Sequence, residues 1–167
     1  VRRLVGSEMC IRDRNNIDYL DQKILSALQD DASQSLEDVA TSVGSSKTPV
    51  WNRIKKLKKN GFINKQVALL DSDLLGFGMC FYVLVKTSQH EVEWSKKFLE
   101  ALKRRPEILE AHRLAGDIDY ILKVRVSDAA AYDRFYQSLT RDVAIFNVTA
   151  LLSMEELIYT TKLPIGT

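Results

Sequence analysis

The part of the sequence that most constrains the fold is VATSVGSSKTPVWNRIKKLKKNGFINKQVALL, residues 39–70, which holds seven Lys or Arg residues and no Asp or Glu. A turn of small and polar residues, Gly44 to Pro49, interrupts it, and Val50, Ile54 and Leu57 then recur at helical spacing. The positive charge is therefore predicted to lie on an ordered helix rather than on a tail. A basic helix of this kind is suited to a phosphate backbone.

Two shorter helices are predicted before this basic helix. Asp18 and Asp21 stand at the amino end of a segment with apolar residues on one helical face, which predicts a helix over Tyr19–Asp30. Ser35 begins a segment that resembles a capping box, and Gly44 is a suitable left-handed stop for this second helix.

The third helix is expected to begin at a Ser46 cap and to end near Asn60, before Gly61. Two short helices joined by a tight turn, the second of them basic, are the outline of a helix-turn-helix. Residues 62–70 then have β-branched and aromatic character without helical spacing, which predicts a wing or connecting strand.

Side chains of the third helix that lie off its apolar face are candidate DNA contacts. Those near its start would meet base edges, and the basic residues further along would meet phosphates. The predicted contacts are Ser46, Lys47, Thr48, Trp51, Asn52, Arg53, Lys55, Lys56 and Lys59. Two alternatives stay open at this point. The lysines could form only a solvated surface, and Trp51 could be a core residue beside Leu28.

The composition limits the classes of protein to consider. The 167 residues are 46% hydrophobic and 28% charged, as in ordinary globular proteins, and the longest apolar run, Phe77–Val85, is too short to span a membrane. Cys10 and Cys80 have neither disulfide nor zinc-site spacing, so a reducing cytoplasm is expected. Residues 1–14 resemble a non-native or disordered leader. Residues 1–70 carry a net charge of +4 and residues 71–167 of −2, which indicates two modules.

Residues 77–167 alternate between strand-like and helix-like patterns in the order β-α-β-β-α-β. This is the order of a ferredoxin-like sandwich, in which both helices cover one face of the sheet. A second copy is expected to cover the other face, giving a homodimer that reads pseudo-palindromic DNA. The predicted elements are strand Phe77–Lys86, helix Glu91–Arg104, strand Ile108–Leu114, strand Tyr120–Val126, a helix capped by Ser127, and strand Val143–Met154.

Three ordered motifs then resemble those of the Lrp/AsnC, or feast/famine, transcriptional regulators. The motifs are Ile17-Asp18-x-x-Asp21-x-x-Ile24-Leu25, Val43-Gly44-x-Ser46-x-Thr48-Pro49-Val50-x-x-Arg53-Ile54-x-x-Leu57-x-x-x-Gly61-Phe62-Ile63 and Gly116-Asp117-x-Asp119-Tyr120-x-Leu122-Lys123. The resemblance extends from Ile17 to the carboxy terminus. It implies an α+β protein with a winged-helix-like helix-turn-helix domain over residues 15–63, a linker strand and hinge over 64–76, and a sandwich of the RAM or ACT type over 77–167. It also implies dimers that assemble into octamers and an amino acid as effector.

Carried onto this chain, the resemblance places the effector at the contact between dimers. The implied effector residues are Arg113, Gly116, Asp117, Asp119, Tyr120 and Ser153. A carboxylate can hold an α-amino group, and backbone donors nearby can hold a carboxylate. The alternative is that Asp117 and Asp119 only stabilise a tight turn through local backbone bonds.

An enzyme is the main rival to this function. His90 and His112 lack metal-ligand spacing, and no nucleophile or phosphate-loop motif occurs, so no metal or cofactor is expected. A haem-pathway decarboxylase, which shares this fold, could use His112 near the ligand pocket. A pure amino-acid-binding or assembly module would leave the basic helix unexplained. We therefore expect a sequence-specific transcriptional regulator of double-stranded DNA, cytoplasmic and associated with the nucleoid, with no membrane partner.

Overall fold

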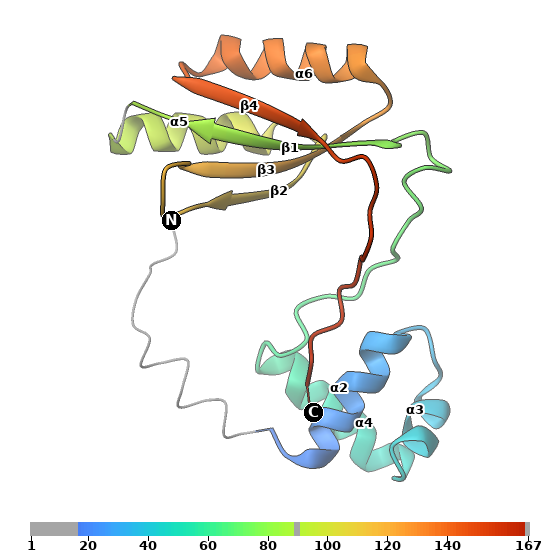
Figure 1. The fold of residues 1–167 in the computed structure, drawn as a ribbon. Coiled ribbons are helices and arrows are strands. Elements are labelled where there is room, and N and C mark those ends of the chain that lie inside the picture. Colours follow the sequence, from blue (N-terminus) through green and yellow to red (C-terminus); the bar gives the residue numbers. More distant parts are fainter. Residues whose placement is uncertain (1–16, 89–90, 166–167) are drawn as a thin grey trace. The chain divides into compact units, whose positions relative to one another are not determined.

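The protein forms two units in the computed structural model, which describes residues 17–88 and 91–165 (Figure 1). One unit contains the chain up to Ala68 together with the carboxy-terminal segment from Ile158, and the other contains Leu69–Leu157. The expected leader, Cys10 and His90 lie outside the described residues. Within the described residues, no helix combines the length and the apolar character that a membrane span needs.

The first unit is built from three helices that agree closely with those predicted: α2 (Tyr19–Asp30), α3 (Leu36–Ser42) and α4 (Lys47–Lys59). Gly44 and Gly61 follow α3 and α4 with φ angles of 70° and 81°. These left-handed conformations suit glycine and explain where the two helices stop. The buried core consists of Ile24, Leu25, Val39, Ala40, Val43, Val50, Ile54 and Leu57.

The amino ends of these helices use side-chain caps in two cases out of three. Asp18 and Asp21 form a reciprocal capping box at α2, and the Ser35 side chain accepts a hydrogen bond from the Asp38 amide at α3. Ser46 occupies the cap position of α4, but its side chain makes no capping hydrogen bond. The predicted cap residue and the start of the helix are therefore confirmed, but the Ser46 side chain does not take part in the cap.

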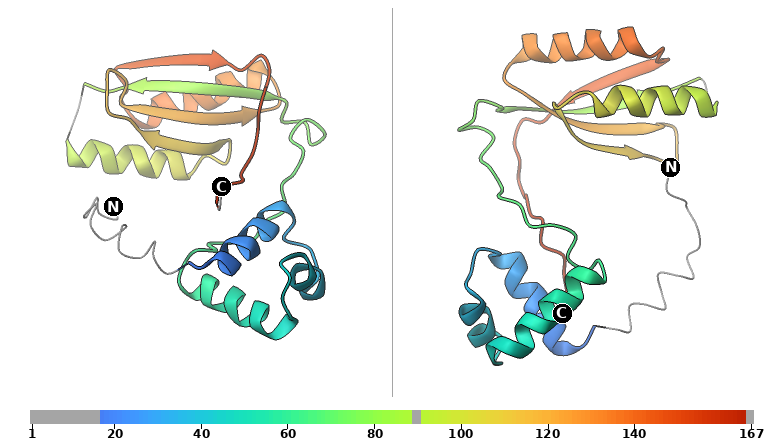
Figure 2. Two further views of the ribbon diagram at one scale, coloured as in Figure 1. Left: turned by 60° about the horizontal axis from the view of Figure 1, so that its bottom comes forward. Right: turned by 180° about the vertical axis from the view of Figure 1, so that it is seen from behind.

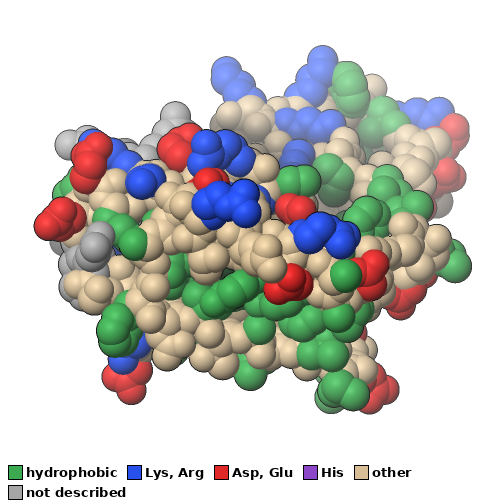
Figure 3. Space-filling model, turned by 90° about the horizontal axis from the view of Figure 1, so that it is seen from above, with side chains coloured by type: hydrophobic (Ala, Val, Ile, Leu, Met, Phe, Trp, Pro, Cys, Tyr) green, Lys and Arg blue, Asp and Glu red, His purple; other side chains and the backbone are tan. Residues whose placement is uncertain are grey.

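The predicted strand over residues 62–70 is not present in the described chain. These residues have no helix or strand assignment, because no neighbouring strand of the same chain pairs with them. The linker instead exposes its large apolar side chains. On the face shown in Figure 3, apolar side chains lie among charged ones. Those more than half exposed are Val67, Leu69, Leu70, Leu74 and Leu75.

Residues 158–165 belong to the helical unit, whereas the sandwich was expected to extend over residues 77–167. Gln29 of α2 accepts a hydrogen bond from the Leu163 amide (2.7 Å) and donates one to the Leu163 carbonyl (3.2 Å). Lys162 forms an ion pair with Asp30, and Ile165 packs against the helical core. The segment from Ile158 to Ile165, here called the tail, is thus anchored on α2.

The second unit is the predicted ferredoxin-like sandwich. Its four strands form an antiparallel sheet in the order β2-β3-β1-β4 (Figure 1). The first and last strands are shorter than predicted, since Phe77 still belongs to a turn and Val143 ends the second helix. The elements are β1 (Met79–Lys86), α5 (Val92–Lys103), β2 (Ile108–Arg113), β3 (Tyr120–Val126), α6 (Ala129–Asp142) and β4 (Asn147–Leu152).

Both helices of the second unit pack on the same face of the sheet (Figure 2). Alternate residues of β1 and β3, such as Val83 and Leu122, are fully buried against α5 and α6. The residues between them, such as Leu84 and Ile121, are only half-buried and form the opposite face. The core consists of Phe81, Val83, Val85, Trp94, Phe98, Ala101, Leu102, Leu122, Val124, Val126, Phe135, Leu139 and Val143.

The cap of α6 differs from the prediction by one residue. Asp128, and not Ser127, accepts the hydrogen bond from the Ala131 amide (2.7 Å). The Ser127 hydroxyl donates a hydrogen bond to the same carboxylate (2.9 Å). These two hydrogen bonds, with the amide first, hold the pKa of Asp128 below its ordinary value.

We expect removal of residues 158–167 to lower the free energy of unfolding of the helical unit by about 1–2 kcal/mol, because the tail no longer supplies two hydrogen bonds and a surface ion pair. Amide hydrogen exchange should show reduced protection at the end of α2, around Gln29. A chain that lacks only residues 166–167 is the control. Unchanged protection of α2 in the shorter chain would contradict the anchoring of the tail.

Candidate functional site

The helix α4 presents two exposed rows of polar and basic side chains. Val50, Ile54 and Leu57 are buried, so the residues on the other side of α4 face solvent. Lys47, Trp51 and Lys55 form one row at four-residue spacing, and Thr48, Asn52 and Lys56 form the next. These six side chains, with Ser46 and Lys59, are exposed. Eight of the nine predicted DNA contacts are therefore accessible, and Arg53 is the exception.

The amino end of α4 has no anionic side chain in its first turn. The first backbone N–H groups of a helix have no helical acceptor, and the helix dipole makes this end positive. Because the Ser46 side chain makes no capping bond, these donors remain suited to a phosphate oxygen. Lys47 lies at the same end and forms an exposed ion pair with Glu37 of α3 (2.7 Å).

Trp51 is on the surface, so the alternative that placed it in the core is wrong. Its exposed fraction is 46%, and the Lys55 ammonium lies 4.6 Å from the centre of its ring. This distance is typical of a cation–π contact, which holds the lysine stem against the ring. The aromatic face and the positive charge are thus presented together on one row of α4.

Arg53 turns away from the exposed rows toward α2. Its Nη1 atom lies 2.5 Å from a carboxylate oxygen of Asp18 and 2.8 Å from one of Asp21. Asp21 is only 4% exposed, so the guanidinium compensates a buried carboxylate. The hydrogen bond from Arg53, followed by that from the Asp21 amide, holds the pKa of Asp18 below its ordinary value. Arg53 therefore ties the basic helix to α2.

The basic stretch is free of acidic residues in sequence but not in space. Glu37, Asp18 and Asp21 come from the two preceding helices and pair with its Lys and Arg residues. Sequence reasoning recognised Asp18 and Asp21 as caps only and missed this second role. A signal did exist, since capping carboxylates lie at helix ends, where neighbouring helices of a small bundle approach.

A surface hollow of about 520 Å³ lies beside this ion pair. It is bordered by two carboxylates and two cationic side chains, so its charges balance. It offers no excess positive charge for an anion, whereas the exposed rows of α4 do carry unbalanced lysines. Its lining residues are Ile17, Asp18, Asp21, Pro49, Asn52, Arg53 and Lys56.

The predicted effector turn joins β2 to β3 and is closed by backbone hydrogen bonds. The Leu114 amide donates to the Asp119 carbonyl (2.8 Å), and the Asp119 amide donates to the Val85 carbonyl (3.1 Å). The Asp119 carboxylate accepts a hydrogen bond from the Thr87 amide (2.8 Å). The Asp119 carboxylate therefore bonds a backbone amide 32 residues away rather than the backbone of its own turn, and one of its oxygens is already engaged.

The other residues of the turn differ in accessibility. Gly116 has a φ of 152°, in the region that favours glycine, and both Gly116 and Asp117 are exposed. Tyr120 is half-buried, and its ring lies 4.8 Å from that of Phe98. Arg113 is exposed and pairs with Tyr120 in the sheet register. Five of the six predicted effector residues are therefore gathered at one end of the sheet.

Ser153 lies at the opposite end of the sheet. Its amide donates a hydrogen bond to the Cys80 carbonyl (2.9 Å), and Cys80 pairs with Arg125 at the far end of β3. Arg125 lies five positions after Tyr120 along β3, a distance of about 17 Å. The structure does not bring Ser153 together with the turn within one copy of the chain.

Within the described residues, no group of three or more His, Cys, Asp or Glu side chains is placed to hold a metal ion. His112 is exposed and lies 3.4 Å from a carboxylate oxygen of Glu110.

Comparison with known families matches both units of the chain. A family described as winged helix-turn-helix DNA-binding matches residues 17–64, and one described as Lrp/AsnC ligand binding domain matches residues 80–163. The DNA-binding transcriptional activator DecR of Escherichia coli is 40% identical over 150 residues, which cover 89% of this chain and 99% of DecR.

Two solved structures resemble the fold over most of its length. The first is an AsnC family transcriptional regulator from Agrobacterium tumefaciens, with a TM-score of 0.85, 42% identity, and coverage of 88% of this chain and 96% of that chain. The second is a transcriptional regulator from Neisseria meningitidis in complex with L-Met, with a TM-score of 0.84, 25% identity and the same coverage. These relatives are regulators and not enzymes, which removes the basis for the decarboxylase alternative.

We expect Arg53→Gln to lower the free energy of unfolding by about 1–3 kcal/mol, because the buried Asp21 carboxylate loses its charged partner. Urea unfolding would measure the change. Lys56→Gln, on an exposed position of the same helix, is the control and should change stability little.

The same variant should alter the acid dependence of stability. Because the folded-state pKa of Asp18 is lowered, its contribution is present above the unfolded pKa of about 3.9 and is lost as the pH falls through the folded value. The wild-type chain should therefore lose more stability between pH 5 and pH 2 than Arg53→Gln. Parallel acid profiles of the two chains would contradict the Arg53–Asp18 interaction.

Proposed function

Because this chain belongs to the Lrp/AsnC family of transcriptional regulators, we propose that it binds pseudo-palindromic double-stranded DNA through α4 and that an amino acid modulates its binding or assembly. The observation that carries this proposal is the pair of exposed basic and polar rows on α4, opposite its buried row. A recognition helix needs this division, because one side must pack in the core while the other reaches the groove.

The side chains of α4 have two roles in the proposed complex. Lys47, Thr48, Trp51 and Asn52 lie near its amino end, where they meet base edges in the major groove. The lysines further along, Lys55, Lys56 and Lys59, meet phosphates. Arg53 is reassigned from a phosphate contact to a positioning residue, because both of its carboxylate partners come from α2.

The proposed recognition of pseudo-palindromic DNA requires a homodimer. The half-buried face of the sheet opposite α5 and α6 and the exposed apolar linker residues both offer surface for a second copy. A two-fold axis would place two α4 helices on successive half-sites. Further assembly to an octamer is part of the proposal, as is action at the nucleoid in the cytoplasm.

The proposed effector site is the turn from Arg113 to Tyr120. The Asp119 oxygen that does not accept from the Thr87 amide would hold an ammonium group, and Arg113 would hold a carboxylate. Ser153 would join this site only from another copy, since it lies at the other end of its own sheet. The L-Met complex of the Neisseria meningitidis regulator supports an amino acid as the class of ligand.

To test DNA binding, we compare the double variant Lys55→Gln/Lys59→Gln with wild type by fluorescence anisotropy, on a duplex selected from a random pool. For each phosphate that a lysine no longer neutralises, the slope of log K against log salt should fall by about 0.9. The matched control is Lys58→Gln/Lys65→Gln, which removes the same charge from positions outside the predicted contact set. If the two double variants had equal effects, the loss of binding would reflect overall charge and not specific phosphate contacts of Lys55 and Lys59.

To test the effector turn, we compare wild type with Asp119→Asn in a thermal-shift screen of the twenty amino acids, since a ligand of the folded state raises the melting temperature. The amide keeps an acceptor for Thr87 but removes the charge that would hold an ammonium group. The active amino acid should bind at least tenfold more weakly, with the unliganded melting temperature nearly unchanged. Asp133→Asn on α6 is the control, and an unaltered response of Asp119→Asn would locate the effector elsewhere.

A further inference from the structure

A hollow of about 260 Å³ lies at the end of the sheet opposite the effector turn. It is bordered by the carboxyl end of β3, by one side of α6 and by the loop between α5 and β2. Three guanidinium groups and one carboxylate line it, together with apolar side chains. The residues used below are Arg105, Glu107, Arg125, Arg134, Phe77 and Phe135.

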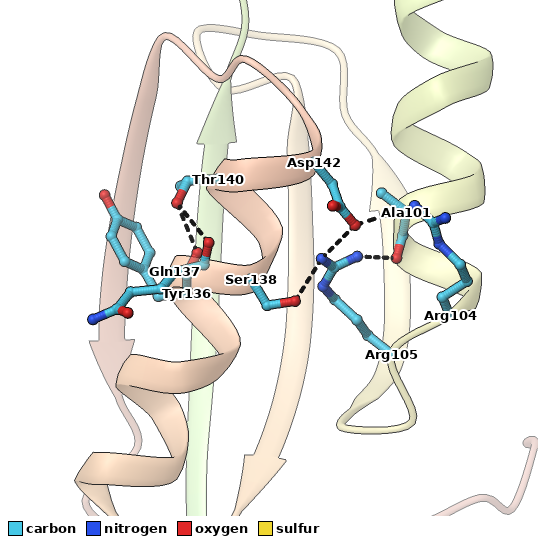
Figure 4. A network of polar contacts seen from close by, with 8 residues as sticks. All are labelled: Ala101, Arg104, Arg105, Tyr136, Gln137, Ser138, Thr140 and Asp142. Carbon is cyan, nitrogen blue, oxygen red and sulfur yellow. Dashed lines mark hydrogen bonds and ion pairs between the residues drawn. The ribbon is translucent and has the colours of Figure 1, made fainter.

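Arg105 is a buried and fixed wall of this hollow, with an exposed fraction of 7%. It follows α5, and its guanidinium folds back to donate to the Ala101 carbonyl, to the Ser138 hydroxyl (2.8 Å) and to the Asp142 carboxylate (2.9 Å), as Figure 4 shows. Its Nε atom is buried and has no partner among the described residues. The side chain is thus pre-organised, with one donor unsatisfied.

The two other guanidinium groups are less firmly compensated. Arg125 donates a long hydrogen bond to the Phe77 carbonyl (3.4 Å) and lies 3.5 Å from a Glu156 oxygen and 4.0 Å from an Asp73 oxygen, which are long separations for ion pairs. Arg134 is exposed and makes no ion pair within 4.0 Å in the described part of the chain. Both therefore retain donors for an added anion.

Glu107 supplies the opposite charge on the same wall. One of its carboxylate oxygens is buried and has no hydrogen-bond partner among the described residues. A buried carboxylate oxygen without a donor is costly, and an ammonium group or a water molecule would satisfy it. The hollow therefore offers several donors for carboxylates and one acceptor for a cation, beside the apolar rings of Phe77 and Phe135.

We propose that this hollow is a second small-molecule site that takes an acidic amino acid. The two carboxylates of the ligand pair with the arginines, its ammonium group pairs with Glu107, and its methylene groups lie against the phenylalanine rings. Asp142 and Glu156 lie outside the hollow and offset part of the charge of Arg105 and Arg125. Arg134 makes no ion pair in the described part of the chain and is offset only by longer-range attraction to Asp128. The inference goes beyond the proposed function and does not depend on DNA binding.

The test uses isothermal titration calorimetry of the full chain with L-glutamate as the probe. Arg134→Gln should weaken binding at least tenfold, because one carboxylate of the ligand loses its partner. The matched control is Arg141→Gln, which removes the same charge from an exposed position of α6 that does not line the hollow. Since Arg134 is exposed, thermal unfolding should show both variants folded.

A second comparison tests the role of Glu107. Wild type should bind L-glutamate at least tenfold more tightly than glutarate, which lacks the amino group, and Glu107→Gln should remove this preference. Sulfate should not compete with L-glutamate at equal concentration. Three results would overturn the site: no binding at millimolar L-glutamate, equally tight binding of sulfate, or unchanged binding of L-glutamate by Arg134→Gln.

The same titration distinguishes binding of L-glutamate at the hollow from binding at the effector turn. Binding abolished in Asp119→Asn but kept in Arg134→Gln would assign L-glutamate to the turn and overturn this proposal. DNA affinity, measured separately by anisotropy, tests the proposed function. A hollow that binds no L-glutamate in a chain that still binds DNA would refute the second site alone.

Discussion

The ion pair of Arg53 with Asp18 and Asp21 is the interaction on which the position of α4, the proposed DNA-binding helix, depends. One guanidinium bridges a reciprocal capping box and the middle of α4, so the start of α2 and the recognition surface are held by the same atoms. A rigid scaffold of this kind lets the neighbouring side chains reach outward without losing their spacing. Asp18 and Asp21 of the first motif and Arg53 of the second thus form a structural contact with one another.

The helical unit is joined to the sandwich by two covalent connections rather than one. The linker after Ala68 leads into β1, and the chain after β4 returns as the tail that anchors on α2 through Gln29. A segment held at both ends has less conformational freedom than a free terminus. Any change in the sandwich that alters the end of β4 therefore has a physical route to α2 as well as to the linker.

Local patterns predicted the elements well, because helix periodicity, alternation in strands and glycine stops are properties of neighbouring residues. Tyr19–Asp30 and Tyr120–Val126 have the predicted bounds. Apart from the cap of α6 and the ends of the first and last strands, the errors concern partners distant in sequence. Residues 62–70 have strand-like composition but no strand to pair with. The basic stretch contains no acidic residue, yet Glu37 from the preceding helix forms an ion pair with its Lys47. Arg105 was not predicted as buried, since its partner Asp142 is 37 residues away.

The candidate ligand sites divide along the same principle. The turn from Arg113 to Asp119 was predictable because its residues are consecutive, whereas the register of β1 with β3 and β4 decides that Ser153 lies about 17 Å away. A two-fold or higher assembly can bring opposite ends of two sheets together, which one chain cannot do. The six predicted effector residues can therefore contact a single ligand in one way only. If Ser153 and Asp119 contact the same ligand, they must come from different copies, and the ligand then couples binding to assembly by mass action.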